Sequence, residues 1–398
     1  MSGNQDAPPL AEAEVGESKS TSAADAETGS DSERSPSPPL GPLAAALAKG
    51  PQKSKASRAK IAPAAPPPEP PPPAVEEAPK ELIVVDENTT ELDLNHGRIG
   101  KIENLEQLKN LERLYLRWNL IKKIEGLSTL STLVELELYD NQITKIENLD
   151  GLVNLEILDL SFNRLTEISG LEKLLNLKRL FLSSNRITEI KNLGHLNKLD
   201  LLELGDNRIR EIKNLETLTT LTQLYLGKNK INQIKNLDTL VNLEILVLQS
   251  NRLIRIENLE SLVNLTQLYL SENGITVIEK LDNQKNLQTL DLAQNRIKVI
   301  ENIKHLSELE ELWMNDNEVE SWSSVEYLTD NKKLKTIYLE RNPLERNDNT
   351  AYRRKLKLIL PTLQQIDATL FADLPALVPR PRAPPRPNLL FSRVDFTE

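Results

Sequence analysis

The sequence predicts an α/β fold, a right-handed solenoid of about twelve turns with a parallel β-sheet on its concave face. An asparagine recurs every 22 residues through the centre of the chain. Almost every recurrence follows a short stretch in which one residue separates two leucines. Repetition at this length is typical of solenoids, whose units bury their apolar side only by stacking on their neighbours.

The repeated asparagine occupies the same position in ten consecutive units. These residues are Asn119, Asn141, Asn163, Asn185, Asn207, Asn229, Asn251, Asn273, Asn295 and Asn317. Gly97 takes the position one step earlier, and Asn342 follows after a longer step, so the terminal units are expected to be irregular caps. Because a buried amide can satisfy backbone groups where the chain turns inward, we expect the asparagines to form a ladder.

The residue pattern within one unit predicts a short strand followed by tight turns. In Leu180-Phe181-Leu182, a period of two directs both leucines inward and Phe181 outward. Apolar residues then recur at every third position, as at Ile187, Ile190, Leu193 and Leu196. This spacing favours 3₁₀-like turns on the convex face over a full α-helix.

Composition divides the chain into four regions. Residues 1–80 form a Pro/Ser/Ala/Glu-rich tail that we expect to be disordered, because it cannot bury enough apolar surface to offset its ordering entropy. The solenoid is predicted at 81–342 and a helical C-terminal cap at 343–371, where Tyr352 to Leu356 begin an amphipathic segment that covers the last unit. Residues 372–398 form a second, Pro/Arg-rich disordered tail.

Composition also indicates an intracellular protein that binds neither membranes nor nucleic acid. The chain has no cysteine and begins without the basic start and apolar run of a secretory signal, which also disfavours a bacterial surface invasion protein with 22-residue repeats. No apolar run approaches the length of a membrane span. The net charge of −10 lacks the positive excess that phosphate contacts need.

Residues that could carry catalysis or hold a metal are scarce. His195 and His305 lie five units apart and cannot meet, and His96 lies in the first unit. The chain shows no phosphate-binding glycine loop, nucleophile elbow or metal-ligand cluster. We therefore expect no enzyme activity, no cofactor and no metal site, with a coincidental pair of acids on the concave face as the alternative.

The expected strand midpoints, which lie between paired apolar residues, predict a binding surface on the concave face. In chain order they are Asp93, Tyr115, Glu137, Asp159, Phe181, Glu203, Tyr225, Val247, Tyr269, Asp291, Trp313 and Tyr338. None is a lysine or arginine, and six are aromatic. Strand preference alone would favour valine, isoleucine and threonine, yet only one valine occurs. Aromatic residues flanked by carboxylates are typical of interface anchors and favour a basic partner.

The repeats are leucine-rich repeats, and three segments give a more specific resemblance. The stretches ELWMNDNEVESW, YLERNPLERN and YRRKLKLILPTLQQIDATLF resemble the protein phosphatase 1 regulatory subunit 7 family from about Leu82 to Phe371. The resemblance implies a regulator, found in nucleus and cytoplasm, that binds the catalytic subunit of protein phosphatase 1 through its concave face. We expect a monomer before complex formation.

The resemblance also implies particular contact residues for the phosphatase. They are Asp159, Phe181, Glu203, Tyr225, Glu311, Trp313 and Tyr338, with Tyr225 where the vertebrate pattern has Phe. In the C-terminal tail, Arg393, Val394 and Phe396 resemble a short docking motif of phosphatase regulators, although Asp395 is a poor fit to its variable position. The alternative function is a structural leucine-rich-repeat adaptor for another partner, such as a cytoskeletal or axonemal assembly.

Overall fold

The computed structural model describes residues 85–348 and 350–370. The predicted solenoid and most of the predicted cap fall within these ranges. The predicted tails 1–80 and 372–398, and the tail motif of Arg393, Val394 and Phe396, lie outside the described residues.

The described chain forms one continuous β-sheet in which strands follow one another in sequence order. Twelve short strands come from the repeats: β1 (Glu91–Asp93), β2 (Arg113–Tyr115), β3 (Glu135–Glu137), β4 (Ile157–Asp159), β5 (Arg179–Phe181), β6 (Leu201–Glu203), β7 (Gln223–Tyr225), β8 (Ile245–Val247), β9 (Gln267–Tyr269), β10 (Thr289–Asp291), β11 (Glu311–Trp313) and β12 (Thr336–Tyr338). Each pairs in parallel with the next.

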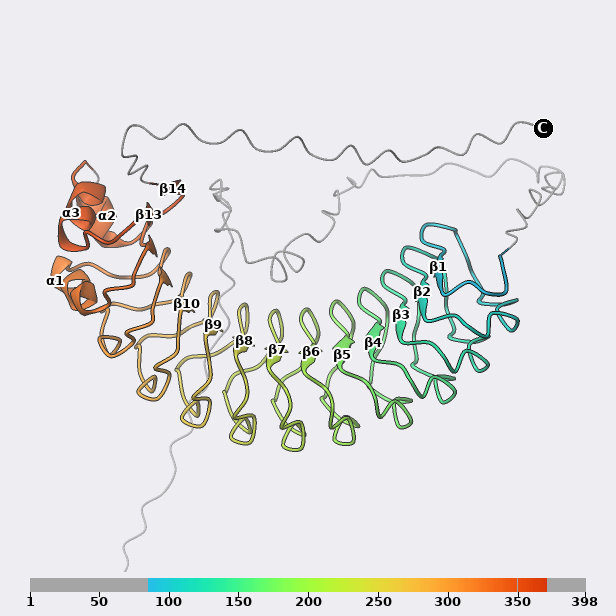
Figure 1. Ribbon diagram of the computed structural model, residues 1–398. Coiled ribbons are helices and arrows are strands. Elements are labelled where there is room, and N and C mark those ends of the chain that lie inside the picture. Colours follow the sequence, from blue (N-terminus) through green and yellow to red (C-terminus); the bar gives the residue numbers. More distant parts are fainter. Residues whose placement is uncertain (1–84, 349, 371–398) are drawn as a thin grey trace, which may run out of the picture. The chain divides into compact units, whose positions relative to one another are not determined.

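The strands pair with equivalent residues side by side. Leu158 lies opposite Leu180, and Asp159 lies opposite Phe181. Neighbouring strands of a sheet are about 4.8 Å apart, so each side-chain position becomes a row that advances by that step. Figure 1 shows the described turns stacked in an arc with their strands along its inner edge. The predicted parallel sheet and its concave position are therefore confirmed.

The core is a continuous column of leucine and isoleucine that no single turn could bury alone. The central leucine of almost every strand is fully buried, as at Leu158, Leu180 and Leu202. The apolar residues of the outer turns, such as Ile187 and Leu193, pack into the same cluster. Stacking therefore supplies the hydrophobic burial, as expected for a solenoid.

The repeated asparagines form the predicted ladder between turns. The Asn207 side chain accepts a hydrogen bond from the Ile187 amide of the preceding turn (2.9 Å). Its Nδ2 donates to the carbonyls of Leu182 (3.0 Å) and Leu204 (3.1 Å), one in each of two adjacent turns. The same three contacts recur at Asn163, whose side chain is also buried.

A second row of asparagines was not anticipated from the sequence. Asn148 and Asn192 have left-handed backbone conformations, with φ of 60° at each, and their Nδ2 atoms donate to the carbonyls of Ile124 and Ile168 in the preceding turns (2.7 Å each). Asparagine tolerates this conformation better than most residues. Gly170 takes the same position in another turn, where an added Cβ would lie 2.4 Å from a backbone oxygen.

The outer side of each turn follows the predicted period of three without forming a continuous helix. Leu196 donates its amide to the carbonyl of Leu193 (2.9 Å), and Leu199 donates to Leu196 (3.0 Å). Bonds between residues three apart are those of a 3₁₀-helix. The outer face is therefore built from single 3₁₀-like turns.

The C-terminal end departs from the regular repeat and closes the column. The sequence did not predict α1 (Trp322–Glu326) or η2 (Tyr327–Asp330), which occupy the longer step before Asn342. After it come α2 (Pro343–Asn347) and α3 (Tyr352–Ile359), then β13 (Gln365–Ile366) parallel to β12 and β14 (Thr369–Leu370) antiparallel to β13. Tyr352 and Leu356 are buried in the core cluster, so α3 covers the last turn as expected.

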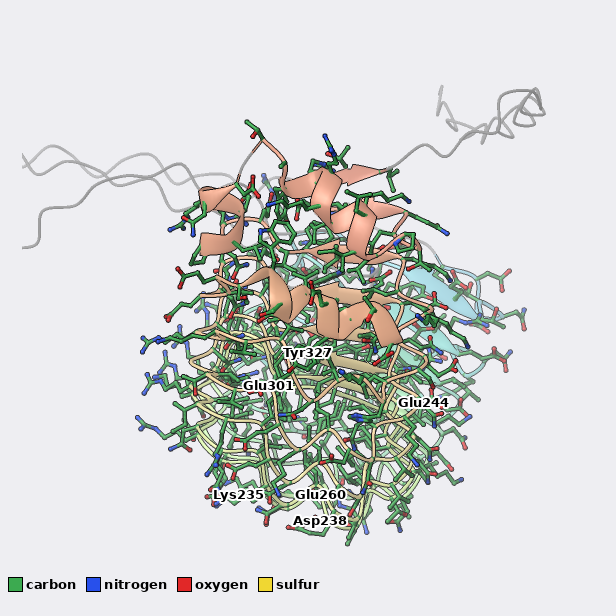
Figure 2. The ribbon with its side chains drawn as sticks, turned by 90° about the vertical axis from the view of Figure 1, so that its left-hand side faces the viewer. Lys235, Asp238, Glu244, Glu260, Glu301 and Tyr327 are labelled. Carbon is green, nitrogen blue, oxygen red and sulfur yellow. The ribbon has the colours of Figure 1, made fainter. Side chains whose placement is uncertain are left out.

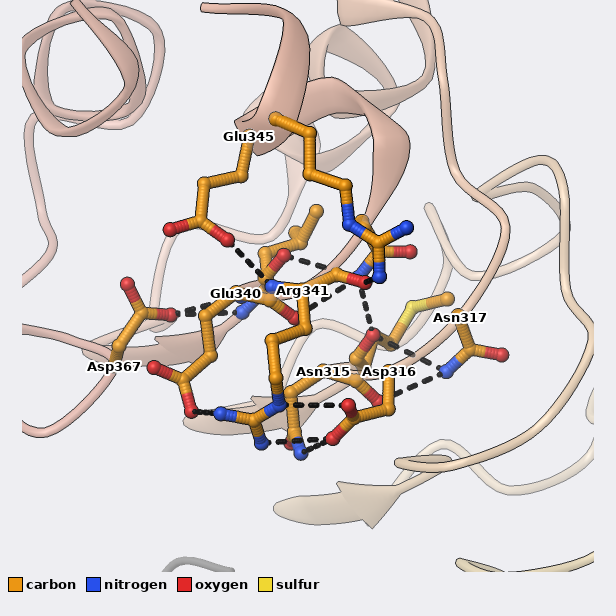
Figure 3. Close-up of polar contacts among 11 residues, drawn as sticks. Asn315, Asp316, Asn317, Glu340, Arg341, Glu345 and Asp367 are labelled. Atoms are coloured by element: carbon orange, nitrogen blue, oxygen red, sulfur yellow. Dashed lines mark hydrogen bonds and ion pairs between the residues drawn. The ribbon is translucent and has the colours of Figure 1, made fainter. Parts of the chain in front are cut away.

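Polar contacts join the last two repeats to each other and to the cap (Figure 3). Arg341 makes a two-pronged contact with Asp316 (2.6 and 2.7 Å) and also bonds Glu340. Asp367 accepts hydrogen bonds from the amides of Leu339 (3.0 Å) and Glu340 (3.1 Å). Paired guanidinium and carboxylate groups of this kind are stronger than neutral hydrogen bonds.

We expect Asn207→Ala to destabilise the array by roughly 3 kcal/mol, because it leaves several buried backbone groups without partners. The matched control is Asn242→Ala, whose side chain makes one exposed bond to the carbonyl of Thr219. Denaturant midpoints and exchange of the Ile187 amide would measure the difference. Equal losses in the two variants would contradict the proposed role of the ladder.

Candidate functional site

All seven residues predicted to contact a partner lie on the concave side of the sheet. Each repeat strand has three residues, of which the central one enters the core and the other two face the opposite side. Phe181 and Trp313 are the last residues of β5 and β11, and Glu311 is the first residue of β11. The residues expected at strand midpoints are therefore strand ends, but they do share one face.

Several of these side chains are more buried than an open inner wall would require. Tyr225, Trp313 and Tyr338 are only 4–6% exposed. They belong to a second apolar cluster, separate from the leucine core, which we call the concave cluster. Val247 and Tyr269 are among its members, and Phe181 packs against it. Lateral packing of large rings across neighbouring strands explains the burial, and the period-two pattern alone could not reveal it.

The aromatic rings near the C-terminal end of this cluster pack edge to face. The ring centroids of Tyr269 and Trp313 are 6.1 Å apart, and those of Trp313 and Tyr338 are 5.9 Å apart. Tyr269 therefore packs against a residue predicted to contact the partner, and its position between paired leucines was the available signal. The buried indole Nε1 of Trp313 has no hydrogen-bond partner among the described residues, although such groups usually have one.

Two acids lie beside the aromatic rows near the middle of the array. Burial raises the pKa of Asp159, while the Ser161 amide, which donates to its carboxylate (2.8 Å), opposes the shift. Burial, with a further contribution from Asp159, raises the pKa of Glu203 to about 7. A cation supplied by a partner would stabilise both carboxylates in their charged form.

A third buried acid lies between the aromatic side chains of β9 and β11. Asp291 accepts hydrogen bonds from the Ser271 hydroxyl (2.5 Å) and the Ala293 amide (3.0 Å), and it is 2% exposed. Burial nevertheless raises its pKa to about 7. The carboxylate is thus held in place by local hydrogen bonds, and no described lysine or arginine forms an ion pair with it.

The N-terminal end of the concave face differs, because a cation is present there. Arg117 forms an ion pair with Glu137 across two neighbouring turns. Arg117 lies two residues beyond Tyr115, after the second of the paired leucines. The sequence pattern considered only residues between them and therefore did not include Arg117. Arg179, the first residue of β5, is a second cation on the concave side. The absence of lysine and arginine therefore applies to the twelve positions singled out in the sequence and not to the whole concave face.

Each of the three histidines makes a contact with another residue of the array. The Nε2 of His195 lies 2.9 Å from the carbonyl of Leu171, and that of His305 lies 2.8 Å from the carbonyl of Leu281, in each case in the preceding turn. His96 stacks on Trp118, with ring centroids 4.4 Å apart. Within residues 85–348 and 350–370, no group of three or more His, Cys, Asp or Glu could hold a metal ion, and no helix there has the length and hydropathy to cross a membrane.

Family models match the repeats over much of the array. A model described as leucine-rich repeats in two copies matches residues 131–173 and 285–327, and a second leucine-rich-repeat model matches residues 180–277. Together with the parallel sheet and its 22-residue period, these matches decide the architecture. The chain has a leucine-rich-repeat fold.

Curated relatives of this leucine-rich-repeat chain carry the name protein phosphatase 1 regulatory subunit 7. The protein of that name from Xenopus tropicalis is 58% identical over 51 residues, and the one from Homo sapiens is 56% identical over the same length. Each alignment covers 13% of this chain and 14% of the relative, so the chain matches far less than two thirds of the relatives' length. The predicted resemblance is confirmed over that stretch.

A solved bacterial structure shares the fold over a longer range. The crystal structure of an internalin (inlF) from Listeria monocytogenes has a TM-score of 0.58 and 26% sequence identity to this leucine-rich-repeat chain. The match covers 72% of this chain and 88% of the internalin.

We expect Asp291→Asn to stabilise the protein at pH 8 more than at pH 5. The folded-state pKa of Asp291 is about 7, above an unfolded value near 4. The folded state therefore binds the extra proton, and this group's contribution to stability falls as pH rises between about 4 and 7. Asparagine removes a penalty on the order of 2–4 kcal/mol at pH 8.

Thermal unfolding of both proteins across this pH range would measure the change. The exposed Asp282→Asn variant, which removes the same formal charge, is the control. A gain for Asp291→Asn that is the same at every pH would show that the Asp291 carboxylate is not strained by its burial.

Proposed function

We propose that the chain is a non-catalytic regulatory subunit that binds the catalytic subunit of protein phosphatase 1 and controls its assembly, localisation or substrate choice. The observation that carries the proposal is the match of 58% identity to a protein phosphatase 1 regulatory subunit 7. A leucine-rich-repeat array is a binding scaffold, which agrees with a role as a regulatory subunit.

The concave face is the surface we assign to this partner. It supports the proposal because apolar rings and buried acids lie side by side there. Phe181 is half-buried and still offers apolar surface, and the Trp313 indole has a free donor among the described residues. Glu203 and Asp159 favour a partner with lysine or arginine at matching positions.

The remaining parts of the proposal concern cellular context. We propose that the chain acts in nucleus and cytoplasm and is a monomer until it joins its partner, and that this partner is a protein and neither nucleic acid nor a membrane. The competing function, a structural adaptor for a different protein, shares the same fold. It differs in one measurable respect, because an adaptor of that kind would not bind the phosphatase.

We expect Phe181→Ala and Trp313→Ala each to weaken binding of the purified phosphatase catalytic subunit by about 2 kcal/mol or more, since large rings at the centre of an interface carry most of its energy. Isothermal titration calorimetry with the full chain would measure this loss of binding free energy. Tyr327→Ala is the control, because this exposed ring lies on η2 and outside the concave cluster (Figure 2).

Two results would have distinct meanings. A wild-type chain that does not bind the phosphatase would overturn the proposed function and leave the adaptor. Binding that survives both substitutions would move the interface away from the concave face. Because Trp313 packs between Tyr269 and Tyr338, Trp313→Phe is a milder test than Trp313→Ala: it keeps an aromatic ring at this position and removes the indole donor together with part of the ring volume.

We also expect phosphatase affinity to fall as pH drops from 8 to 6. The pKa of Glu203 is about 7 in the free chain, and a partner cation would lower it, so binding below pH 7 must expel a proton. Glu203→Gln should bind more weakly at pH 8 and show a flatter pH profile. If the affinity of both proteins changes with pH to the same extent, Glu203 does not lie in the interface.

A further inference from the structure

Five consecutive turns carry a positively charged residue at one repeated position on the flank of the array. We call this the cation row; it follows the ladder asparagine by one residue and consists of Arg164, Arg186, Arg208, Lys230 and Arg252. The four arginines are exposed, and Lys230 is half-buried. The chain as a whole carries a net charge of −10, so such a series stands out against the general composition.

The backbone holds the cation row in regular register. The amide of Arg186 donates to the carbonyl of Leu165 in the preceding turn (2.8 Å), and the amide of Arg208 donates to Ile187 (2.8 Å). The other three residues make the equivalent bond at the same distance. Turns are about 4.8 Å apart at the sheet, on the inner edge of the arc, and slightly further apart beyond it. The five residues therefore extend over at least about 19 Å, with one cation at each step.

The cation row is not neutralised within the described part of the chain. None of its five side chains takes part in an ion pair or a side-chain hydrogen bond to a described residue. Lysines on the convex side behave differently. Lys191, Lys213 and Lys235 pair with Glu167 (2.9 Å), Glu189 (2.8 Å) and Glu211 (2.6 Å), respectively.

The two flanks of the array differ in composition, because the positions directly before the strands include both Glu244 and Lys178. Glu244 directly precedes β8 and lies on one flank in Figure 2, where the view runs along the array; side chains that end in nitrogen project from the opposite flank. After each strand the chain reaches that opposite flank. The residues of the cation row lie there, because each follows its strand and its ladder asparagine. Adjacent like charges repel, so an external anion would stabilise a row of this length.

The step between cations indicates the shape of that anion. Carboxylates along one face of an α-helix, at alternating spacings of three and four residues, advance by about 5.4 Å per turn. Same-face residues of an extended strand are further apart, at roughly 6.8 Å. The helical repeat is closer to the step of the cation row. A nucleic acid fits less well, because its phosphates would also approach the acidic concave face.

We propose that the cation row binds an acidic α-helix of a partner protein, whose carboxylates form one stripe along the helix. Four arginines provide forked donors that match carboxylate geometry. The site lies outside the concave cluster, so it offers a second foothold that is independent of the phosphatase proposal.

The test uses the full chain and two fluorescent, end-capped peptides of about 16 residues. Both contain the same number of glutamates in an alanine-rich background. In the first the glutamates form one stripe, and in the second the same residues are permuted around the helix. Circular dichroism verifies that their helicity is equal. Equal net charge removes non-specific attraction as a cause of any difference in fluorescence anisotropy.

We expect the striped peptide to bind about tenfold more tightly than the permuted one, with affinity that falls as salt increases. Arg186→Glu with Arg208→Glu should abolish this preference. The matched control is Lys191→Glu with Lys213→Glu, which makes the same charge change on the convex side and should leave the preference intact.

Four outcomes would overturn the proposal. The first is equal binding of the two peptides, and the second is an equal loss of preference in the convex control. The third is tighter binding of a 20-nucleotide oligothymidylate, or of phosphatidylserine vesicles, that depends on Arg186 and Arg208. The fourth is sedimentation that shows a dimer broken by the Arg186→Glu and Arg208→Glu pair. The last would assign the cation row to a second copy of the chain. Phosphatase binding, measured separately, does not depend on any of them.

Discussion

The hydrogen bonds from each ladder asparagine to two adjacent turns are the constraint on which the rest of the structure depends. A turn with three strand residues has few backbone partners of its own, and its post-strand bend faces the interior. Asn207 satisfies an amide of the preceding turn and carbonyls of two turns with one side chain. Because every turn is fixed to its neighbour in the same way, equivalent side chains fall into straight rows.

These rows explain why one repeat pattern produces several distinct surfaces. The central leucine of each strand enters the core, and the residues on either side of it line the concave face. The position after the ladder asparagine forms the cation row, while the convex lysines pair with glutamates from neighbouring turns. Position within the repeat, more than position in the chain, decides what a residue contacts.

The concave face combines two properties that seldom coexist in a stable interior. Its rings bury one another, which favours folding, while Glu203 and Asp291 remain ionisable groups whose burial raises the pKa of each to about 7. Burial without a cation is a cost to the free protein. A partner that supplies positive charge would relieve this cost, which links the electrostatics of the free face to the partner chemistry that we propose.

The sequence by itself determined the solenoid, the parallel sheet, the asparagine ladder and the common face of Asp159, Phe181 and Trp313, because a period of two within a period of 22 leaves few alternatives. Only the tertiary structure decided how those residues contact one another. The burial of Tyr225, the ring contacts of Tyr269 and the pairing of Arg117 with Glu137 all join different turns, and they depend on rotamers and lateral packing that no single repeat encodes. The helices α1 and η2 were not predicted for a related reason. The last spacing between ladder asparagines is longer than the others, so it breaks the period from which the other turns were predicted.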